Sequence, residues 1–284
     1  MTPPNAGTLY IVGTPIGNLD DITFRAIQTL KQVDLIAAED TRHTGKLLHH
    51  FQIDTPQMSY HTHNHRQRVT DFVERLQQGQ SIALVTDAGL PGVSDPGNEL
   101  VRACIASEIP VSPIPGVSAS LTALCAAGLA TDRFIFEGFL PVKGKERRQR
   151  LAVLTQQSCT MILYEAPHRL CQTLKDLIAV LGPEHSVVIA RELTKLHEEF
   201  WRSSLEAALT EFSRRQPKGE ITLVLAGVES VMPEWSEERI RTELQELIHQ
   251  GLSRSQASRQ LAQQTTQSRQ EIYQIALTLT DDVT

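Results

Sequence analysis

The sequence predicts an α/β protein made of two α/β domains and a small helical tail. Short β-branched apolar runs alternate with helical patterns through the first half of the 284-residue chain, and this alternation returns in the second half. From about Ser236 onward only helical patterns remain. Such alternation is typical of a mostly parallel sheet covered by helices on both faces. We therefore expect α/β domains at residues 8–115 and 116–230 and a helical tail at residues 236–284.

The first half contains five strand patterns with helical patterns between them. The expected strands are Leu9–Val12, Leu35–Ala38, Gln57–His61, Ile82–Thr86 and Val111–Ile114. The expected helices are Thr23–Gln32, Thr44–Phe51, His65–Gln78 and Asn98–Ser107. Three prolines then cluster and end in Pro115-Gly116, which predicts a hinge before the second domain.

The second half repeats the strand patterns and then changes to helices. The expected strands are Phe134–Phe139, Thr160–Glu165, Val187–Arg191 and Ile221–Ala226, and Pro233 closes this part. The tail predicts helices at Glu237–Gln250, Ser255–Gln264 and Ser268–Leu279, with Ser253, Ser255 and Ser268 as N-caps. The turn at Gly251-Leu252-Ser253 resembles that of a helix-turn-helix unit.

Composition excludes several classes of protein. The formal net charge of −6 argues against a uniformly basic nucleic-acid binder, although local basic patches remain possible. The four cysteines have no CxxC pair and no spacing typical of a disulfide framework or zinc site, so we expect buried free thiols at Cys104, Cys125, Cys159 and Cys171. No signal peptide or membrane-spanning apolar run is evident, which predicts a soluble, cytoplasmic protein.

Two loops rich in glycine and proline are the strongest functional signals. They cover residues 13–23 and 86–97, and each begins where an expected strand ends. Ligands of open α/β sheets bind outside the carboxyl ends of the strands, and glycine there lets main chain approach a ligand closely. The first loop lacks both the Gly-Lys-Ser/Thr ending of a phosphate loop and the GxGxxG spacing. The loops therefore predict a composite small-molecule pocket built largely from main chain.

Charged and histidine-rich segments have open interpretations. Glu39-Asp40-Thr41-Arg42 and the run Arg191–Glu199 follow strands directly, and each is either part of a site or a set of structural ion pairs. His61, His63 and His65 alternate, which favours a polar surface facing a substrate over a metal site, because no carboxylate or cysteine has useful spacing. A basic stretch is either a solvated helix start or an anchor for nucleic-acid phosphates; it comprises Lys143, Lys145, Arg147, Arg148 and Arg150.

An ordered set of motifs closely resembles the ribosomal RNA small subunit methyltransferase I family, which belongs to the tetrapyrrole-methylase-like (class III) methyltransferases. The resemblance covers about residues 8 to 228. The motifs are Thr14-Pro15-Ile16-Gly17-Asn18-Leu19, Glu39–Arg42, Asp87–Gly97, Pro115–Ala119, Gly138–Pro141, Tyr164–Arg169, Arg191–Glu199 and Lys218-Gly219-Glu220. Two departures are small: Leu90 stands where threonine is expected, and Ala166 where serine is common.

The resemblance implies an enzyme that uses S-adenosylmethionine to methylate the ribose 2′-oxygen of a cytidine in 16S rRNA, at position 1402 of that RNA. It implies a homodimer of two α/β domains, with the cofactor in the cleft between the two domains. The residues that it assigns to the cofactor are Pro15, Ile16, Asp87, Gly89, Leu90, Val93, Ser94, Ser118, Ala119, Tyr164, Leu193 and Gly219.

Methyl transfer from a sulfonium to a hydroxyl is an in-line displacement, which requires positioning and help in removing a proton but no metal. The candidates for proton removal or charge stabilisation are Asp40, Arg42, Lys195 and Glu198. Two alternatives remain: a tetrapyrrole or corrinoid methyltransferase of the same fold, and a non-catalytic ribosome-binding protein. The motifs at Glu39–Arg42 and Arg191–Glu199 argue against the first, and the intact loops argue against the second. The tail either docks on rRNA or stabilises packing or a dimer.

Overall fold

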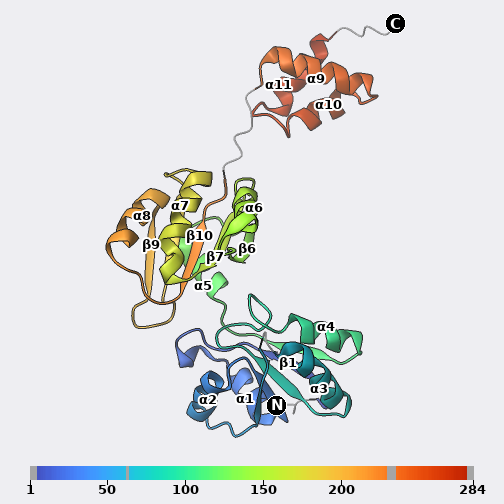
Figure 1. The fold of residues 1–284 in the computed structure, drawn as a ribbon. Helices are drawn as coiled ribbons and strands as arrows, with labels where there is room; N and C mark the ends of the chain where they lie inside the picture. The colour runs from blue at the N-terminus through green and yellow to red at the C-terminus, as the bar shows by residue number, and fades with distance from the viewer. Residues whose placement is uncertain (1–4, 62–63, 229–234, 280–284) are drawn as a thin grey trace. The chain divides into compact units, whose positions relative to one another are not determined.

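The structure is a computed structural model that describes residues 5–61, 64–228 and 235–279. The chain forms two compact units, and the boundary between them follows Val228 (Figure 1). The first unit contains both β-sheets, and the second contains the helices of the tail. Among the described residues no helix is long and apolar enough to cross a membrane.

The first sheet has five parallel strands in the order β3-β2-β4-β1-β5. The strands are β1 (Leu9–Val12), β2 (Leu35–Ala38), β3 (Gln57–Ser59), β4 (Ile82–Val85) and β5 (Val111–Ile114). The chain leaves β1 toward β2 on one side and leaves β4 toward β5 on the other. The order therefore reverses between neighbouring strands β1 and β4, and a crevice for a ligand is expected at such a switch point.

Helices cover both faces of this sheet, as the alternation predicted. They are η1 (Leu19–Asp21), α1 (Phe24–Gln32), α2 (Thr41–His50), α3 (His65–Gln77) and α4 (Asn98–Ala106). Ile36 and Ala38 pack with Leu30 and Leu48 of α1 and α2 on one face. On the other face, Leu35 and Ala37 pack with residues of α3 and α4. Successive residues of β2 are thus buried on opposite faces, which explains the continuous apolar run.

The second sheet is mixed, with the order β6-β7-β10-β8-β9. The strands are β6 (Phe134–Phe139), β7 (Thr160–Glu165), β8 (Ser186–Arg191), β9 (Glu199–Ser204) and β10 (Ile221–Leu225). Strands β6 and β7 pair in parallel. The other pairs of this sheet are antiparallel: β10 with β7 and with β8, and β9 with β8. The sequence did not predict β9, whose first residue, Glu199, is the last residue of the charged run Arg191–Glu199. An antiparallel neighbour needs no crossover helix, so the strand–helix alternation does not reveal it.

The remaining helices of the first unit are α5 (Ala119–Ala127), α6 (Gly144–Leu154), η2 (Pro167–Arg169), α7 (Leu170–Leu181) and α8 (Leu205–Arg214). Helix α5 packs on one face of the second sheet, where Ala123 and Leu124 meet Ile162 and Val224. Ile16, from the loop after β1, joins the same apolar cluster. The loops of the first sheet are thereby held against the second.

Several boundaries differ from the predictions for local reasons. Helix α2 begins at Thr41, three residues earlier than expected, because the side chain of Asp40 accepts a hydrogen bond from the Arg42 amide. Ser255 lies inside α10 (Arg254–Leu261) and is not a cap, because Ser253 forms a capping box with Gln256.

The thiols are free, but they are not all buried. Cys104 is buried, Cys159 and Cys171 are half-buried, and Cys125 is exposed. The expectation for Cys125 was wrong because α5 is apolar all round, while only one side of it meets the sheet.

The tail folds around its own core, as predicted. Its helices are α9 (Glu237–His249), α10 and α11 (Arg269–Thr278). Leu244, Leu261 and Ile272 are buried, and Leu247 and Ile275 pack against them. Gly251 has φ +94°, a backbone angle that favours glycine, and it turns the chain between α9 and α10. Pro233 lies outside the described residues.

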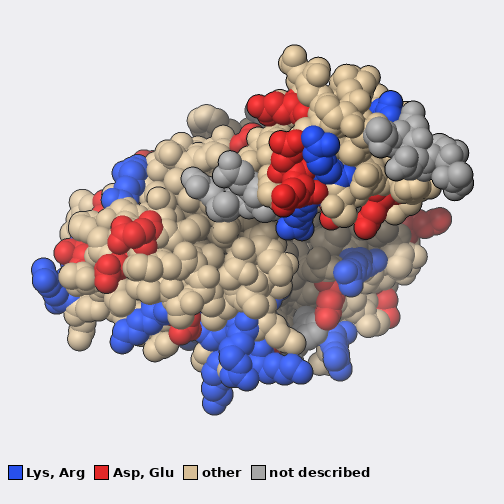
Figure 2. All heavy atoms as spheres, turned by 90° about the horizontal axis from the view of Figure 1, so that it is seen from above, with Lys and Arg blue, Asp and Glu red and all other residues tan. Residues whose placement is uncertain are grey.

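Figure 2 shows a face covered mostly by uncharged residues, with separate groups of Asp and Glu and with Lys and Arg gathered along its lower edge. This distribution fits a protein of net charge −6 that carries local basic patches.

Candidate functional site

The loops that follow β1 and β4 are joined by reciprocal main-chain hydrogen bonds. The Thr14 amide donates to the Gly89 carbonyl at 2.9 Å, and the Gly89 amide donates to the Thr14 carbonyl at 3.1 Å. Gly89 has φ +84°, which a residue with a side chain rarely adopts. The hydroxyl of Thr14 also donates to the carbonyl of Thr86 at 3.1 Å. The two loops therefore form one surface at the switch point of the first sheet.

A cavity of about 290 Å³ lies between this surface and the second sheet, and we call it the main-chain pocket. Its lining comes mostly from loops and strand ends of both sheets. The lining residues are Ile16, Ala88, Gly89, Leu90, Val93, Ser94, Asp95, Ser118, Ala119, Phe139, Tyr164, Glu165, Ala166, Pro167, Glu220, Ile221 and Thr222.

A second cavity of about 550 Å³ adjoins the first, and we call it the side pocket. The two cavities share Ile16, Ala88 and Glu220 as wall residues. The side pocket is also lined by Thr14, Pro15, Gly17, Leu19, His43, Thr44, Lys46, Leu47, Thr86, Asp87 and Lys195. The side pocket therefore has lysine cations in its wall, whereas the charged residues of the main-chain pocket are all carboxylates.

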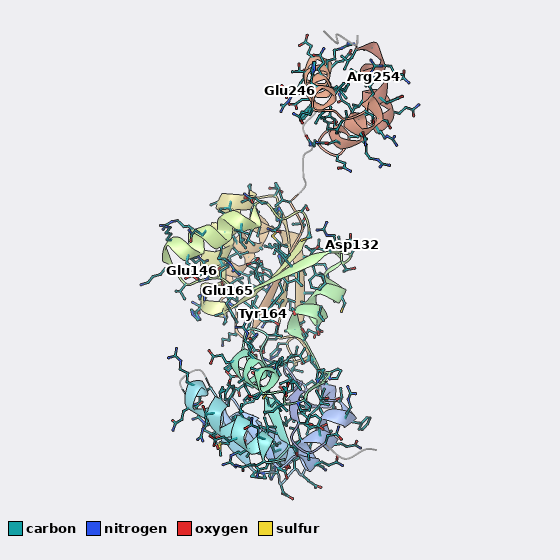
Figure 3. The ribbon with its side chains drawn as sticks, turned by 90° about the vertical axis from the view of Figure 1, so that its right-hand side faces the viewer. Asp132, Glu146, Tyr164, Glu165, Glu246 and Arg254 are labelled. Atoms are coloured by element: carbon teal, nitrogen blue, oxygen red, sulfur yellow. The ribbon has the colours of Figure 1, made fainter. Side chains whose placement is uncertain are left out.

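Tyr164 forms part of the aromatic wall of the main-chain pocket. Its ring packs edge to face against Phe136 and Phe139, with centroids 4.9 and 5.6 Å away. Its hydroxyl accepts a hydrogen bond of 3.2 Å from the Ser120 amide at the start of α5. Figure 3 shows Tyr164 and Glu165 at the end of the second sheet that lies nearer the first. The ring is thus fixed in place by the first turn of α5.

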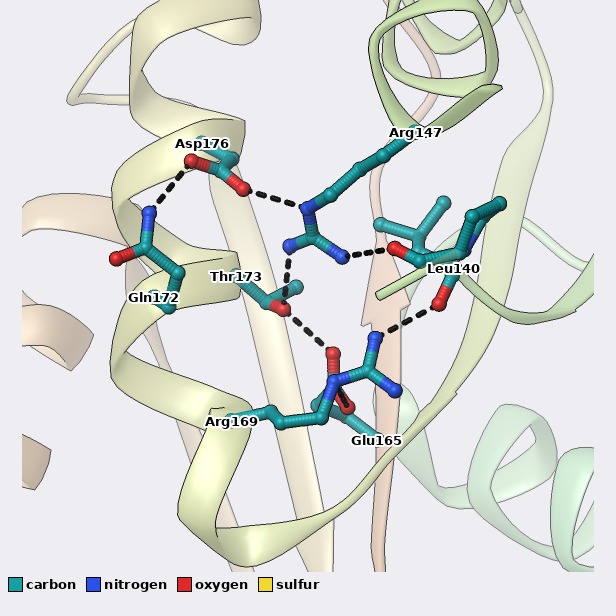
Figure 4. Close-up of polar contacts among 8 residues, drawn as sticks. Leu140, Arg147, Glu165, Arg169, Gln172, Thr173 and Asp176 are labelled. Atoms are coloured by element: carbon teal, nitrogen blue, oxygen red, sulfur yellow. Dashed lines mark hydrogen bonds and ion pairs between the residues drawn. The ribbon is translucent and has the colours of Figure 1, made fainter. Parts of the chain in front are cut away.

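A buried polar network holds the neighbouring wall (Figure 4). The carboxylate of Glu165 accepts hydrogen bonds from the Ala166 amide at 2.8 Å and the Thr173 hydroxyl at 2.5 Å, and it lies 3.2 Å from Arg169. Arg169 donates to the Leu140 carbonyl at 2.7 Å. Glu165 lines the pocket, but its carboxylate is occupied by these partners.

Arg147 extends the same network from α6. It donates to Asp176 at 2.7 Å, to the Thr173 hydroxyl at 2.8 Å and to the Pro141 carbonyl at 2.9 Å. The predicted basic stretch therefore divides by role: Arg147 is buried, whereas Lys143, Lys145 and Arg148 are exposed. Arg150 pairs with Glu137. None of the five lines either cavity.

Three carboxylates surround Thr86 at the end of β4. The Thr86 hydroxyl donates to Glu39 at 2.5 Å, and the Asp87 amide donates to Glu39 at 3.3 Å. Burial, with a contribution from the nearby Glu39, raises the pKa of Asp95 to about 6. Burial also raises the pKa of Asp87. Asp95 faces the main-chain pocket and Asp87 faces the side pocket.

Lys195 is held by a tight loop between β8 and β9. Its ammonium lies 3.0 Å from Glu192 and 3.1 Å from Glu220. Burial acts to lower the pKa of Lys195, but the two carboxylates outweigh it and raise that pKa. A Cβ on Gly17 would lie 2.5 Å from Lys195 Cγ, so the loop after β1 contacts this lysine closely. Lys195 therefore remains a cation at neutral pH beside the side pocket.

The cofactor residues implied by the resemblance fall into three groups. Eight line the main-chain pocket: Ile16, Gly89, Leu90, Val93, Ser94, Ser118, Ala119 and Tyr164. Pro15 and Asp87 line the side pocket. Leu193 is buried in the apolar cluster beneath α5, and Gly219 packs against the Glu192 side chain. Asp95, Phe139 and Thr222 also line the main-chain pocket and were not expected to bind the cofactor, although Asp95 lies within the motif Asp87–Gly97 and Phe139 within Gly138–Pro141.

The candidate catalytic residues are not gathered at one point. Lys195 is the only one of the four that lines either cavity. Asp40 pairs with Arg42 at 2.7 Å, which holds the pKa of Asp40 well below its usual range, and the Arg42 side chain is 89% exposed. Glu198 accepts a hydrogen bond of 2.6 Å from the Thr194 amide and so braces its own loop.

The histidine cluster is described only in part. β3 ends at Ser59, before these histidines, and His63 lies outside the described residues. Across the described ranges no group of three His, Cys, Asp or Glu side chains is placed to hold a metal ion.

Known proteins resemble this chain over most of its length. The model of the tetrapyrrole (corrin/porphyrin) methylases matches residues 8–209. Ribosomal RNA small subunit methyltransferase I of Synechocystis sp. is 58% identical over 277 residues, which cover 97% of this chain and 99% of that protein. The protein of the same name from Halalkalibacterium halodurans is 48% identical over 95% of this chain and 94% of its own length.

Solved structures share the fold at low identity. Uroporphyrin-III-C-methyltransferase from Thermus thermophilus has a TM-score of 0.58 and 20% identity, over 78% of this chain and 95% of that chain. Another structure of the Thermus thermophilus enzyme, with a TM-score of 0.56 and 17% identity over 78% of this chain and 98% of that chain, is a complex with S-adenyl homocysteine. The motifs, the two-sheet fold and these relatives lead to one conclusion: the chain belongs to the tetrapyrrole methylase family and, within it, to the ribosomal RNA small subunit methyltransferase I family.

Proposed function

We propose that the protein transfers a methyl group from S-adenosylmethionine to 16S rRNA of the small ribosomal subunit. The acceptor is the ribose 2′-oxygen of a cytidine, the one at position 1402 by family resemblance. The observation that carries the proposal is the contact between two cavities of different character. The main-chain pocket, whose charged residues are all carboxylates, shares a wall with a pocket that contains a fixed lysine cation.

The main-chain pocket fits the methyl donor. Its volume of about 290 Å³ approaches the range of small-ligand sites, about 300–1,000 Å³, and its walls combine apolar side chains with loop backbone. Among its described lining residues, Glu165 and Glu220 have cationic partners, but Asp95 has no ion pair. Asp95 is therefore the carboxylate placed to balance a cationic group of the cofactor. The cofactor supplies a methyl group on a positively charged sulfur.

The side pocket fits the acceptor. A ribose hydroxyl is a weak nucleophile until its proton leaves, and a nearby cation stabilises the developing negative oxygen. Lys195 is such a cation, because its raised pKa makes it a poor base but a good electrostatic partner. We therefore assign Lys195 to orienting and stabilising the 2′-oxygen. Asp40, Arg42 and Glu198 remain candidates for proton removal or RNA contact.

Two rivals differ in what they would methylate or bind. A tetrapyrrole methyltransferase of the same fold would act on a corrinoid, and a non-catalytic ribosome-binding protein would not transfer a methyl group. The relatives from Synechocystis sp. and Halalkalibacterium halodurans, both named ribosomal RNA small subunit methyltransferase I, favour the rRNA substrate. We also propose a homodimer and a cytoplasmic location, as the family resemblance implies.

The deciding experiment is mass spectrometry of rRNA nucleosides from a strain lacking the protein. The 2′-O-methylated cytidine should disappear and return when the wild-type protein is supplied. Purified protein is then offered S-adenosylmethionine with bare rRNA, assembled 30S subunits or a corrinoid. Methylation of the corrinoid alone, or of none of the three, contradicts the proposal.

A further inference from the structure

Helix α2 has a basic face, and apart from the candidate residue Arg42 the proposed steps do not use it. Residues 41–50 contain no aspartate or glutamate. The side of the helix formed by Thr44, Leu47 and Leu48 is buried. The opposite side is formed by exposed arginine, lysine and histidine residues. We call it the α2 basic face, and it comprises Arg42, His43, Lys46, His49 and His50. The exposed side of this helix therefore has basic side chains and no acidic ones.

This face is continuous with the side pocket. His43 and Lys46, one turn apart on α2, line the pocket together with Lys195 from the loop between β8 and β9. The side pocket also shares three wall residues with the main-chain pocket, so an acceptor group held there lies next to the methyl donor. The α2 basic face therefore extends from the proposed acceptor site to the molecular surface.

The two lysines of the pocket differ in how they are held. Lys195 is fixed between Glu192 and Glu220. Lys46 is exposed, and among the described residues it makes no ion pair. A lysine without a carboxylate partner at the mouth of a cavity is available for an anion of the ligand. Lys46 and Lys195 thus differ in their electrostatic surroundings.

We infer that the side pocket receives the target nucleotide of a single-stranded RNA segment, and that the α2 basic face binds the phosphates flanking that nucleotide. This inference rests on the proposed function. Proteins that recognise RNA by sequence or position mostly take unpaired bases out of loops, and they hold the strand through its phosphates. A volume of about 550 Å³ lies within the range of small-ligand sites, about 300–1,000 Å³.

The basic stretch of α6 is the competing RNA surface. Arg147 is buried in the network with Asp176, and Arg150 is paired with Glu137, so Lys143, Lys145 and Arg148 remain. None of these three borders either cavity. They are exposed cations with no cavity beside them, whereas Lys46 lines the side pocket.

The test measures binding of a fluorescent single-stranded rRNA fragment that contains the target cytidine, by anisotropy with the full-length protein at several salt concentrations. Lys46→Ala should raise the Kd about 3- to 10-fold and reduce the salt slope by about 0.7, the loss of one phosphate contact on a single strand. Lys46→Glu should weaken binding further, and Lys46→Arg should retain it. Affinity for S-adenosylmethionine, measured by calorimetry, should not change.

Two lysine variants serve as matched controls. Lys31→Ala removes an exposed lysine in the last turn of α1 that lines neither cavity, and this variant should bind RNA normally. Lys145→Ala tests the α6 stretch. If wild-type protein binds the fragment but Lys46→Glu binds equally well, or if Lys145→Ala loses as much affinity as Lys46→Ala, the inference is wrong. Failure of wild-type protein to bind or methylate any rRNA contradicts the proposed function instead.

Discussion

Gly13 and Gly116 pack backbone against backbone where β1 and β5 end. A Cβ on Gly13 would lie 2.7 Å from the Gly116 Cα, and a Cβ on Gly116 would lie 2.7 Å from the Gly13 Cα. Real Cβ contacts are not this short, and main chain cannot turn aside as a flexible side chain can. The loop that carries Ile16 and the loop that carries Ser118 are thereby brought to the same cavity.

Gly116→Ala should therefore damage the cofactor pocket as well as stability. Overpacking of this kind costs about 1–3 kcal/mol, and the displaced loops should weaken S-adenosylmethionine binding at least 10-fold. Gly45→Ala is a suitable control, because its Cβ would meet only the end of the Gln57 side chain and alanine favours a helix. Calorimetry and thermal unfolding measure both effects. Wild-type affinity in Gly116→Ala would show that the close approach does not shape the pocket.

Two adjacent arginines of α6 should differ sharply in their effect on stability. Arg147→Met removes a buried guanidinium and leaves Asp176 and Thr173 without their partner, which should lower the free energy of unfolding by about 3 kcal/mol. Arg148→Met changes an exposed residue and should have an effect within about 0.5 kcal/mol. Urea denaturation compares the two variants. Equal stability of both would mean that the network in Figure 4 contributes little.

Asp95 should make stability depend on pH. The raised pKa of about 6 means that the folded state binds this proton more tightly than the unfolded state, so the free energy of unfolding falls as pH rises from about 4 to about 6. Asp95→Asn removes this penalty and should be more stable than wild type at about pH 8, with the gain vanishing below about pH 4. Asp132→Asn, at an exposed position, controls for the change in net charge. A gain that is equal at both pH values would contradict the role given to Asp95.

Lys195→Met should lower kcat about 10²- to 10³-fold on 30S subunits, because it removes the cation proposed to stabilise the 2′-oxygen. Affinity for S-adenosylmethionine should change little, since Lys195 lines the side pocket. Asp40→Asn, Arg42→Ala and Glu198→Gln, assayed in parallel, test the other candidates. If Lys195→Met keeps normal turnover while one of these loses it, the catalytic assignment passes to that residue.

Truncation after Val228 should leave the first unit folded with its affinity for S-adenosylmethionine intact, because the tail has a separate core. If the tail docks on rRNA, the KM for 30S subunits rises and the salt dependence weakens. Few cations of the tail are available to RNA, because Arg254 donates a hydrogen bond to the Leu279 carbonyl and Arg269 donates one to the Ser255 hydroxyl. An unchanged KM in a dimeric truncated protein would leave the tail no docking role.

The sequence by itself determined the elements whose signals are local. Strands buried on both faces, such as Leu35–Ala38, appear as continuous apolar runs, and Ser253 and Ser268 cap helices within a few residues of themselves. The glycine and proline loops predicted a pocket at strand ends because parallel strands place those ends on one edge. Eight of the twelve expected cofactor residues line that pocket, although their binding role stays a prediction.

Only the tertiary structure decided relationships between distant segments. In the sequence Arg147 does not differ from its exposed basic neighbours, but in the structure it is buried and donates hydrogen bonds to Asp176 and Thr173 of another helix. The pKa of Asp95 is raised because folding buries it near Glu39. Strand β9 forms by pairing with β8. The same folding places Lys195 and Lys46 beside one cavity, although they are far apart in the chain. Burial, charge proximity and strand pairing depend on which segments of the chain come into contact, and local sequence patterns do not predict those contacts.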